Sequence, residues 1–190
     1  MAVIMENIYK NFGPQNVLMN FNLHMPKGRT TALMGPSGSG KTTAVNILLG
    51  LQKPDHGRIA GLPPKVSAVF QEDRLLEHAS GLANIQYVVK NHKQHDNKIW
   101  QLLVEAGLAG DAHKPAGDYS GGMRRRLCLC RALAADFDFI VLDEAFKGLD
   151  AALKAEIMAM TKGRIHGKTA LLVTHDADEA AFFGAEIFTL

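Results

Sequence analysis

Residues 35–43 read GPSGSGKTT and directly follow an apolar stretch, residues 29–34. They match the phosphate-binding pattern G-x-x-x-x-G-K-[ST], which operates between a strand and a helix. Residues 29–34 predict a strand, and the residues from the loop through about Leu49 predict a helix. Such a loop wraps its backbone N–H groups around phosphate oxygens, and the helix N-terminus attracts the same anion. The stretch therefore predicts a nucleotide site in an α/β fold.

The side chains of this loop have distinct expected roles. Lys41 is expected to neutralise the β- and γ-phosphates of a nucleotide, and Thr42 to offer its hydroxyl to Mg²⁺. A glycine-rich turn with a solvated lysine is the alternative, which the flanking strand and helix disfavour. The loop residues predicted to bind nucleotide are Gly35, Pro36, Ser37, Gly38, Ser39, Gly40, Lys41, Thr42 and Thr43.

Strand-like and helix-like stretches alternate along the rest of the chain, which predicts a largely parallel sheet with helices on both faces. We expect a P-loop NTPase core, an N-terminal antiparallel β portion and an inserted helical subdomain. The expected strands are residues 3–8, 17–25, 29–34, 57–59, 66–70, 138–145 and 169–173. The expected helices are residues 121–135 and 151–165, with broken helix over 81–106.

Composition argues against two classes of function, nucleic-acid binding and direct insertion into a membrane. The 190 residues carry 21 Lys+Arg against 19 Asp+Glu, a net charge of +2 with no long basic run, so nucleic acid is not an expected partner. No apolar run approaches the roughly 20 residues that span a bilayer, and the N-terminus is unlike a signal peptide. Membrane contact is therefore expected only through a partner. Cys128 and Cys130, two apart on a predicted helix, are expected to be reduced thiols of a cytosolic protein.

A second stretch with candidate catalytic residues runs from Phe139 to Glu144, FIVLDE. It predicts a buried strand that ends in two carboxylates, at the sheet edge where α/β proteins bind ligands. Asp143 suits a water-mediated contact to Mg²⁺, and Glu144 suits polarisation of the water that attacks the γ-phosphate. The alternative is an acid pair that only caps a helix.

Tyr119-Ser120-Gly121-Gly122-Met123 and the helix after it resemble the LSGGQ signature of the ABC ATPases, with Tyr for Leu and Met for Gln. In that family the signature faces the γ-phosphate held by the other subunit. The resemblance thus implies a dimer in which Ser120, Gly121 and Gly122 contact nucleotide in trans. A glycine-rich helix N-cap at Ser120 is the alternative.

The resemblance extends over essentially the whole chain and implies further roles. Gln71 matches the Q-loop glutamine that contacts Mg²⁺ and the attacking water, and His175 matches the switch histidine at the γ-phosphate. Asp150 matches the D-loop, which crosses the dimer interface, and is also expected to cap the helix after it. Phe12 matches the aromatic residue that stacks on adenine, with Tyr9 as a competitor. The implied catalytic set is Glu144, His175 and Gln71, and the implied metal set is Thr42, Gln71 and Asp143.

Two departures from the family are visible. Ala145 follows Glu144 where relatives usually have Pro, so this turn is expected to be less rigid. The sequence also stops at AEIFTL, whose strand near Phe188 is expected to be an exposed edge.

The resemblance implies one cassette over residues 1–190, with a core of 1–71 and 119–190 and a helical subdomain of about 72–118. It implies ATP hydrolysis, with Mg²⁺, in a homodimer that powers a separate transmembrane permease from the cytoplasmic face of the cell membrane. SGGM and VFQEDRLL favour the importer branch for nitrate, sulfonate and taurine. The alternatives are an ABC-type ATPase without a transport role and a regulatory nucleotide-binding module without turnover.

Overall fold

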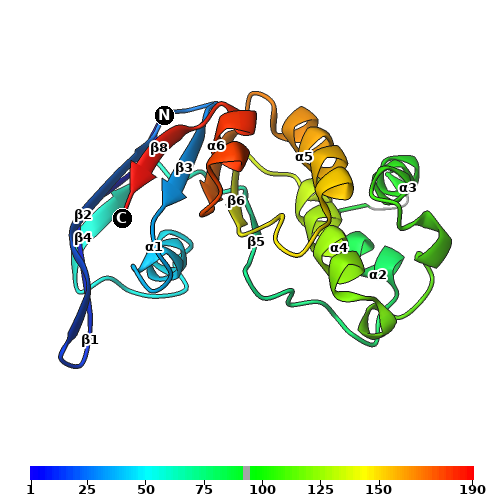
Figure 1. Ribbon diagram of the computed structural model, residues 1–190, viewed down its shortest axis with the longest axis horizontal. Helices are drawn as coiled ribbons and strands as arrows, with labels where there is room; N and C mark the ends of the chain where they lie inside the picture. Colours follow the sequence, from blue (N-terminus) through cyan, green and yellow to red (C-terminus); the bar gives the residue numbers. More distant parts are fainter. Residues whose placement is uncertain (92–94) are drawn as a thin grey trace. The chain divides into compact units, whose positions relative to one another are not determined.

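Strand β3 (Thr30–Met34) pairs in parallel with β7 (Thr169–Val173) on one side and with β8 (Glu186–Thr189) on the other (Figure 1). The computed structural model describes residues 1–91 and 95–190. Strand β6 (Phe139–Asp143) pairs in parallel with β7, and the sheet order is β5-β6-β7-β3-β8, with β5 over Val66–Val69. Every residue of β6 and β7 is buried, as expected for central parallel strands. The predicted α/β fold with a parallel sheet is confirmed.

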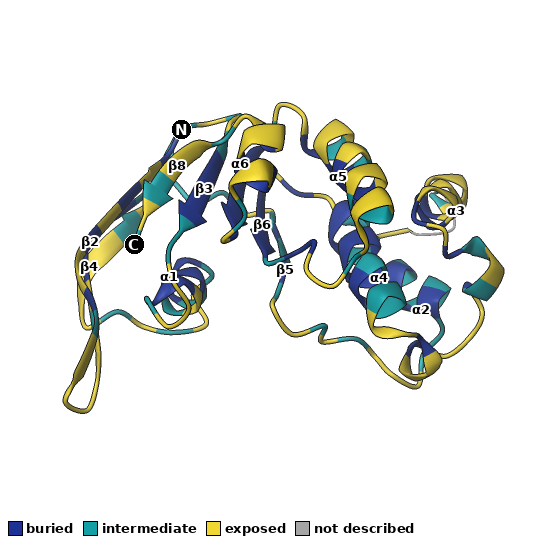
Figure 2. Ribbon diagram, viewed as in Figure 1, coloured by how far each residue is buried: buried dark blue, intermediate teal, exposed yellow. Residues whose placement is uncertain are grey.

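The predicted antiparallel portion is a three-stranded sheet in the order β2-β1-β4. Its strands are β1 (Val3–Phe12), β2 (Gln15–Met25) and β4 (His56–Ala60). Strands β1 and β2 are longer than the sequence indicated, because Phe12 still pairs with Gln15 across a turn of only two residues. This pairing carries the hairpin beyond the buried part of the sheet (Figure 2).

The described residues form two compact units. The first comprises residues 1–66, 138–144 and 167–190, and its helices are α1 (Lys41–Leu48) and α6 (Ala177–Phe183). Strand β8 lies at the edge of the parallel sheet, as expected for the stretch near Phe188. Its residues are mostly exposed, whereas β3 is largely buried (Figure 2).

The second unit comprises residues 67–137 and 145–166 and is mainly helical. Its helices are α2 (Gly81–Gln86), α3 (Asp96–Glu105), α4 (Gly121–Ala134) and α5 (Ala151–Ile165), with 3₁₀ turns at Ala109–Asp111 and Ala116–Asp118. Helix α4 contacts α2, α3 and α5, and buries Leu127 and Leu129 completely. This unit thus includes α4 and α5. The subdomain bounds expected from the sequence assign both helices to the core (residues 1–71 and 119–190), and these bounds remain a prediction.

No helix within residues 1–91 and 95–190 combines the length and the apolar character needed to cross a bilayer. Both cysteines are free thiols on α4, and both are buried, which the sequence analysis did not predict.

Candidate functional site

The loop between β3 and α1 has the geometry of a phosphate-binding loop. Gly40, the residue before α1, has φ 102°, and a Cβ at this position would lie 3.0 Å from the Val17 carbonyl oxygen of β2. Only glycine accepts both this backbone angle and this close approach. The Lys41 side chain is buried, and its Nζ donates to the carbonyl oxygens of Gly35 at 2.8 Å and Pro36 at 2.7 Å. The loop therefore folds around the positively charged ammonium group of Lys41.

The donors of this loop fit a nucleotide phosphate. The Ser39 hydroxyl is buried and has no hydrogen-bond partner among the residues that the structure describes. Thr42 and the stretch 36–38 are exposed at the start of α1, where the helix N-terminus favours an anion. The Thr42 hydroxyl and the Asp143 carboxylate would supply oxygen ligands, the type that Mg²⁺ requires. The residues present thus fit both groups that the sequence predicted.

The two carboxylates after β6 lie in different surroundings. Asp143 is the last residue of β6, pairs with Val173 and is only 2% exposed. Glu144 has φ 46°, a left-handed conformation that non-glycine residues adopt rarely, and its N–H donates to the Val173 carbonyl at 2.9 Å. Unusual backbone of this kind concentrates at functional sites. The two adjacent acids thus differ in burial and in backbone conformation, and their separate roles stay a prediction.

His175 follows β7 and reaches the Glu144 side chain. Its Nδ1 lies 4.0 Å from Glu144 Oε1, and its own side chain is largely exposed. The preceding Thr174 is buried, and its hydroxyl donates to Glu179 Oε2 at 2.7 Å and accepts from the Asp176 N–H at 3.0 Å. Thr174 and Glu179 thus hold the loop that carries His175. The sequence analysis missed them, although a threonine and a glutamate flank this histidine in THDADEA.

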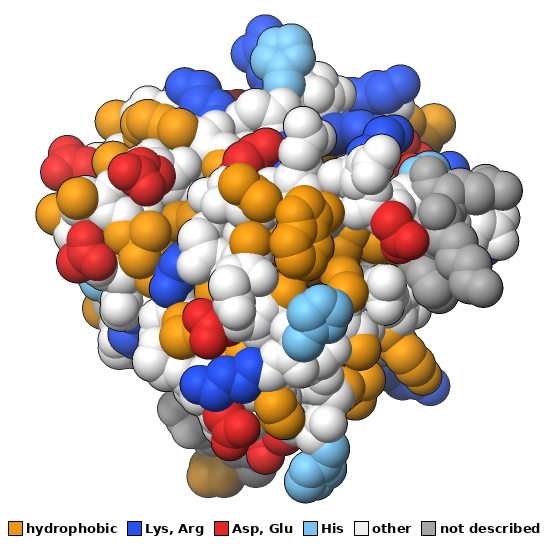
Figure 3. All heavy atoms as spheres, turned by 90° about the vertical axis from the view of Figure 1, so that its right-hand side faces the viewer, with side chains coloured by type: hydrophobic (Ala, Val, Ile, Leu, Met, Phe, Trp, Pro, Cys, Tyr) orange, Lys and Arg blue, Asp and Glu red, His pale blue; other side chains and the backbone are white. Residues whose placement is uncertain are grey.

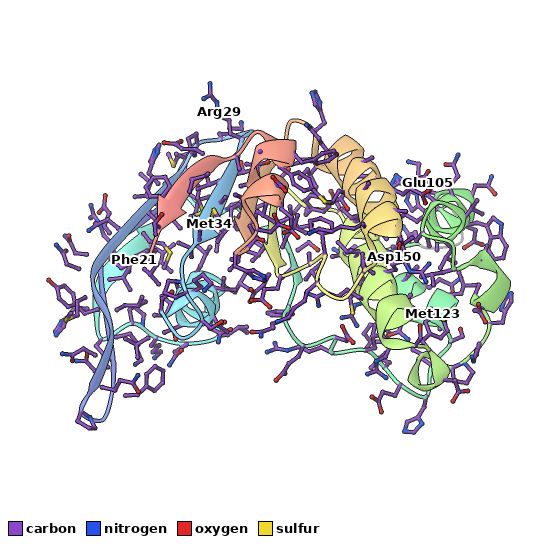
Figure 4. All side chains as sticks on the ribbon, viewed as in Figure 1. Phe21, Arg29, Met34, Glu105, Met123 and Asp150 are labelled. Carbon is purple, nitrogen blue, oxygen red and sulfur yellow. The ribbon has the colours of Figure 1, made fainter. Side chains whose placement is uncertain are left out.

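The signature segment and the D-loop are neighbours in the second unit. The Ser120 hydroxyl accepts from the Met123 N–H at 3.3 Å, and Asp150 Oδ1 accepts from the Leu153 N–H at 3.0 Å. Both predicted helix caps are thus present. A Cβ added to Gly122 would lie 3.9 Å from the Leu149 side chain, so the D-loop passes beside the start of α4. Figure 4 labels Met123 and Asp150 at the starts of α4 and α5, which lie at the same end of this helix pair.

Tyr119, which replaces the usual leucine of the signature, anchors this segment. It is 5% exposed, and its hydroxyl donates to the Asp111 carbonyl at 2.7 Å. Burial raises the pKa of Tyr119, so the phenol stays a donor. A Cβ on Gly81 of α2 would collide with the Tyr119 hydroxyl, which explains the glycine there. The sequence reasoning noted the substitution but not this function of the ring.

The remaining predicted residues lie at the surface. Gln71 is exposed in the second unit, just after β5. Phe12 is 47% exposed at the end of β1, with Lys10 Nζ 5.6 Å from its ring centroid. Tyr9 packs edge-on against His56, with ring centroids 6.2 Å apart. Phe12 remains the predicted adenine contact, with Tyr9 as its competitor, since each ring has a neighbour of its own.

The structure thus places most of the predicted residues in two sets, to which Gln71 and Phe12 do not belong. In the first unit, the phosphate loop, Asp143, Glu144 and His175 belong to the ends of parallel strands and to α1. In the second unit, Ser120, Gly121, Gly122 and Asp150 belong to two adjacent helix starts.

Comparison with known proteins gives consistent results. The chain is 33% identical to an aliphatic sulfonates import ATP-binding protein of Rhodococcus jostii over 100% of this chain and 71% of that protein. It is 34% identical to a sulfate/thiosulfate import ATP-binding protein of Synechocystis, covering 58% of that longer protein. A dimeric bacterial ABC transporter cassette superimposes with a TM-score of 0.87 at 28% identity, covering 99% of this chain and 94% of the other.

The sequence model described as ABC transporter matches residues 18–147, which span the phosphate loop, the signature segment and the acid pair. With this match the predicted enzyme class, an ATP-binding cassette that hydrolyses ATP, is confirmed, and the chain belongs to the ABC transporter family.

Proposed function

We propose that the chain is the ATP-hydrolysing subunit of an importer, which binds Mg-ATP, pairs with a second copy and drives a separate membrane permease. The observation that carries this proposal is the presence of two phosphate-type helix starts in one chain. One is the loop closed on Lys41; the other is the capped start of α4 beside the D-loop. Two such helix starts per chain suit a dimer in which each nucleotide is bound by the Lys41 loop of one copy and by the start of α4 of the other copy.

Within this proposal, each side chain has a defined task. Lys41 exchanges its two carbonyl contacts for phosphate oxygens, and the loop N–H groups hold the same anion. Glu144, whose side chain is 14% exposed, accepts a proton from the attacking water at its carboxylate. His175 is exposed enough to turn toward the γ-phosphate and can contact it with an imidazole nitrogen. Mg²⁺, held by Thr42 and by Asp143 through water, would neutralise charge on the phosphates.

The proposed permease contact is the apolar surface beside α2. Buried Asn84 accepts from the Leu76 N–H at 2.9 Å and donates to the Leu76 carbonyl at 3.0 Å, so the segment 75–79 is fixed to α2. Leu76 is 48% exposed and Tyr87, at the end of α2, is 81% exposed. Figure 3 shows hydrophobic side chains on one face of the molecule, interspersed with charged ones. We expect the permease to cover Leu76 and Tyr87, as the resemblance implies for the helical subdomain.

Phosphate release from Mg-ATP by the purified chain, measured over a range of protein concentrations, tests the proposed dimeric ATPase. Because the active species is a dimer, specific activity should rise with concentration until the dimer is saturated. Binding of ATP without phosphate release at any concentration would favour the regulatory module instead.

The permease is tested by co-purification with a multi-span membrane protein encoded next to this chain. Leu76→Glu should abolish co-purification and any stimulation of hydrolysis by that protein, whereas basal hydrolysis should persist. Retention of the complex in this variant would place the contact elsewhere. Absence of a membrane partner would favour an ATPase without a transport role.

A further inference from the structure

Arg125 of α4 is buried to an unusual degree for an arginine, with 5% of its surface exposed. Arginine is almost never fully buried unless its guanidinium is paired. Its Nη1 donates to the Phe70 carbonyl at 2.6 Å and to the Gln71 carbonyl at 3.4 Å. Its Nε donates to the Ala145 carbonyl at 3.1 Å. One fixed guanidinium plane therefore joins two separate loops of the second unit.

The two loops are the ones that follow β5 and β6. Phe70 and Gln71 come directly after β5, and Ala145 is the first residue after Glu144. Asp73 Oδ1 lies 3.6 Å from Arg125 Nη1 and supplies a countercharge. Buried hydrogen bonds from a charged donor are stronger than those between neutral groups. Because the guanidinium group is planar, it also holds its acceptors in one fixed geometry. The Gln71 backbone is thus joined through Arg125 to the backbone of Ala145.

The identity of residue 145 gives this contact its importance. Residue 145 is Ala, whereas a proline at this position would fix the backbone angle φ of its own residue. Ala145 lacks that restraint, yet it follows Glu144, whose own φ of 46° is a rarely adopted conformation. The hydrogen bond from Arg125 restrains the Ala145 carbonyl from outside the turn.

We propose that Arg125 is a positioning residue for ATP hydrolysis, which holds the Gln71 loop and the turn after Glu144 in one fixed arrangement. This role rests on the proposed function, because it presumes that Gln71 and Glu144 act on the attacking water. Arg125 itself contacts neither nucleotide nor water in this scheme. Misplacement of reacting groups by about 1 Å can cost on the order of 100-fold in rate.

Arg131 provides a matched control on the same helix. Its Nη1 donates to the Arg74 carbonyl at 2.8 Å, and its Nη2 donates to the Asp73 carbonyl at 3.1 Å. It therefore holds the same loop after β5, but the bonds found for it are to residues beyond Gln71. Arg131→Gln removes one positive charge and two carbonyl contacts, whereas Arg125→Gln removes one positive charge and three carbonyl contacts, among them the one to Ala145.

The experiment compares kcat and KM for ATP hydrolysis, ATP affinity and melting temperature in wild type, Arg125→Gln and Arg131→Gln. We expect Arg125→Gln to lower kcat about 10- to 100-fold with KM and ATP affinity nearly unchanged, which marks loss of an interaction specific to the transition state. Arg131→Gln should change kcat by less than about threefold for a similar loss of melting temperature. Arg125→Lys keeps the positive charge but loses the planar arrangement of guanidinium donors. If Arg125→Gln does not fold, we expect the same fall in kcat from Arg125→Lys.

A wild-type kcat in Arg125→Gln or Arg125→Lys would overturn this role. Equal losses in the Arg125 and Arg131 variants, or a parallel loss of ATP affinity, would overturn it too, because the arginine would then only support the fold. A wild-type protein that binds ATP without releasing phosphate would instead contradict the proposed function itself.

Discussion

Glu144 Oε1 lies 4.0 Å from His175 Nδ1, although 30 intervening residues separate the two in the sequence. The proximity follows from the parallel pairing of β6 and β7, in which Asp143 is the partner of Val173. Chains that leave neighbouring parallel strands emerge at the same edge of the sheet. Glu144 is the less exposed of the two side chains, at 14% against 68%. We therefore expect Glu144 to be fixed in place before nucleotide binds, and His175 to be the side chain that moves.

Glu144→Gln should bind Mg-ATP with nearly wild-type affinity and hydrolyse it about 100- to 10,000-fold more slowly, because the amide keeps the shape and loses the base. Such a protein should accumulate as an ATP-bound dimer. Phosphate release and size-exclusion chromatography with ATP measure both effects, and Glu156→Gln, at an exposed position of α5, is the control. Turnover at the normal rate would mean that another group activates the water.

Thr174→Val should destabilise the fold as well as slow hydrolysis. The change is nearly isosteric, but it leaves buried Glu179 without its 2.7 Å hydrogen bond and the Asp176 N–H without its acceptor. Loss of one partner from a buried polar group costs about 1 to 3 kcal/mol of unfolding free energy. Thr174→Ser keeps the hydroxyl and should remain close to wild type in chemical denaturation. Equal stability of the valine and serine variants would show that the hydroxyl does not support this loop.

Local patterns in the sequence predicted much of the fold and part of the site. The strand, loop and helix around Lys41 are adjacent in sequence, and the caps at Ser120 and Asp150 depend only on the next three residues. The contacts of Arg125 and the left-handed backbone of Glu144 were not predicted. They depend on segments brought together by tertiary packing, for which a single sequence holds no periodic signal.

Stability should decline at alkaline pH because of the two cysteines. Burial raises the pKa of Cys128 and of Cys130 to about 12, from an ordinary value of 9.0. Between these values the unfolded chain loses protons that the folded chain keeps, so the stabilisation present below pH 9 is lost as pH rises toward 12. Each thiol contributes a slope of up to about 1.4 kcal/mol per pH unit.

Chemical denaturation between pH 8 and pH 10.5 measures this slope. The control is the double variant Cys128→Ala/Cys130→Ala, which is expected to be less stable at pH 8 but to have a shallower decline above pH 9. Parallel pH profiles for the two proteins would mean that other groups cause any alkaline loss.

Lys41→Ala should abolish ATP binding. Its Nζ is the charge around which the loop closes, through the carbonyls of Gly35 and Pro36, and it is expected to pair with the phosphates. Wild-type protein should therefore melt at a higher temperature with Mg-ATP, with a gain of about 2.7 kcal/mol at 100 times Kd, whereas the variant should gain nothing. Thermal unfolding with and without Mg-ATP measures the difference, and unchanged nucleotide affinity in Lys41→Ala would contradict the loop assignment.

The composite site can be tested by mixing two inactive variants. If Ser120 serves the nucleotide held by the partner's loop, each site of a dimer combines Lys41 from one copy with Ser120 from the other. Lys41→Ala and Ser120→Arg should then each inactivate a homodimer. In a mixed dimer both lesions fall in one site, and the second site is wild type throughout.

The mixture should therefore recover ATP-induced dimerisation, and this is the primary readout. Hydrolysis is the secondary readout, because coupling between the two sites can silence the intact one. The neighbouring start of α5 belongs to the same half-site, since Gly122 lies against Leu149, so Asp150 variants should complement Lys41→Ala in the same way. Two results would contradict the composite site: normal hydrolysis by Ser120→Arg alone, or a mixture that never dimerises with ATP. Ser120 would then serve only as the N-cap of α4, through its 3.3 Å hydrogen bond from the Met123 N–H.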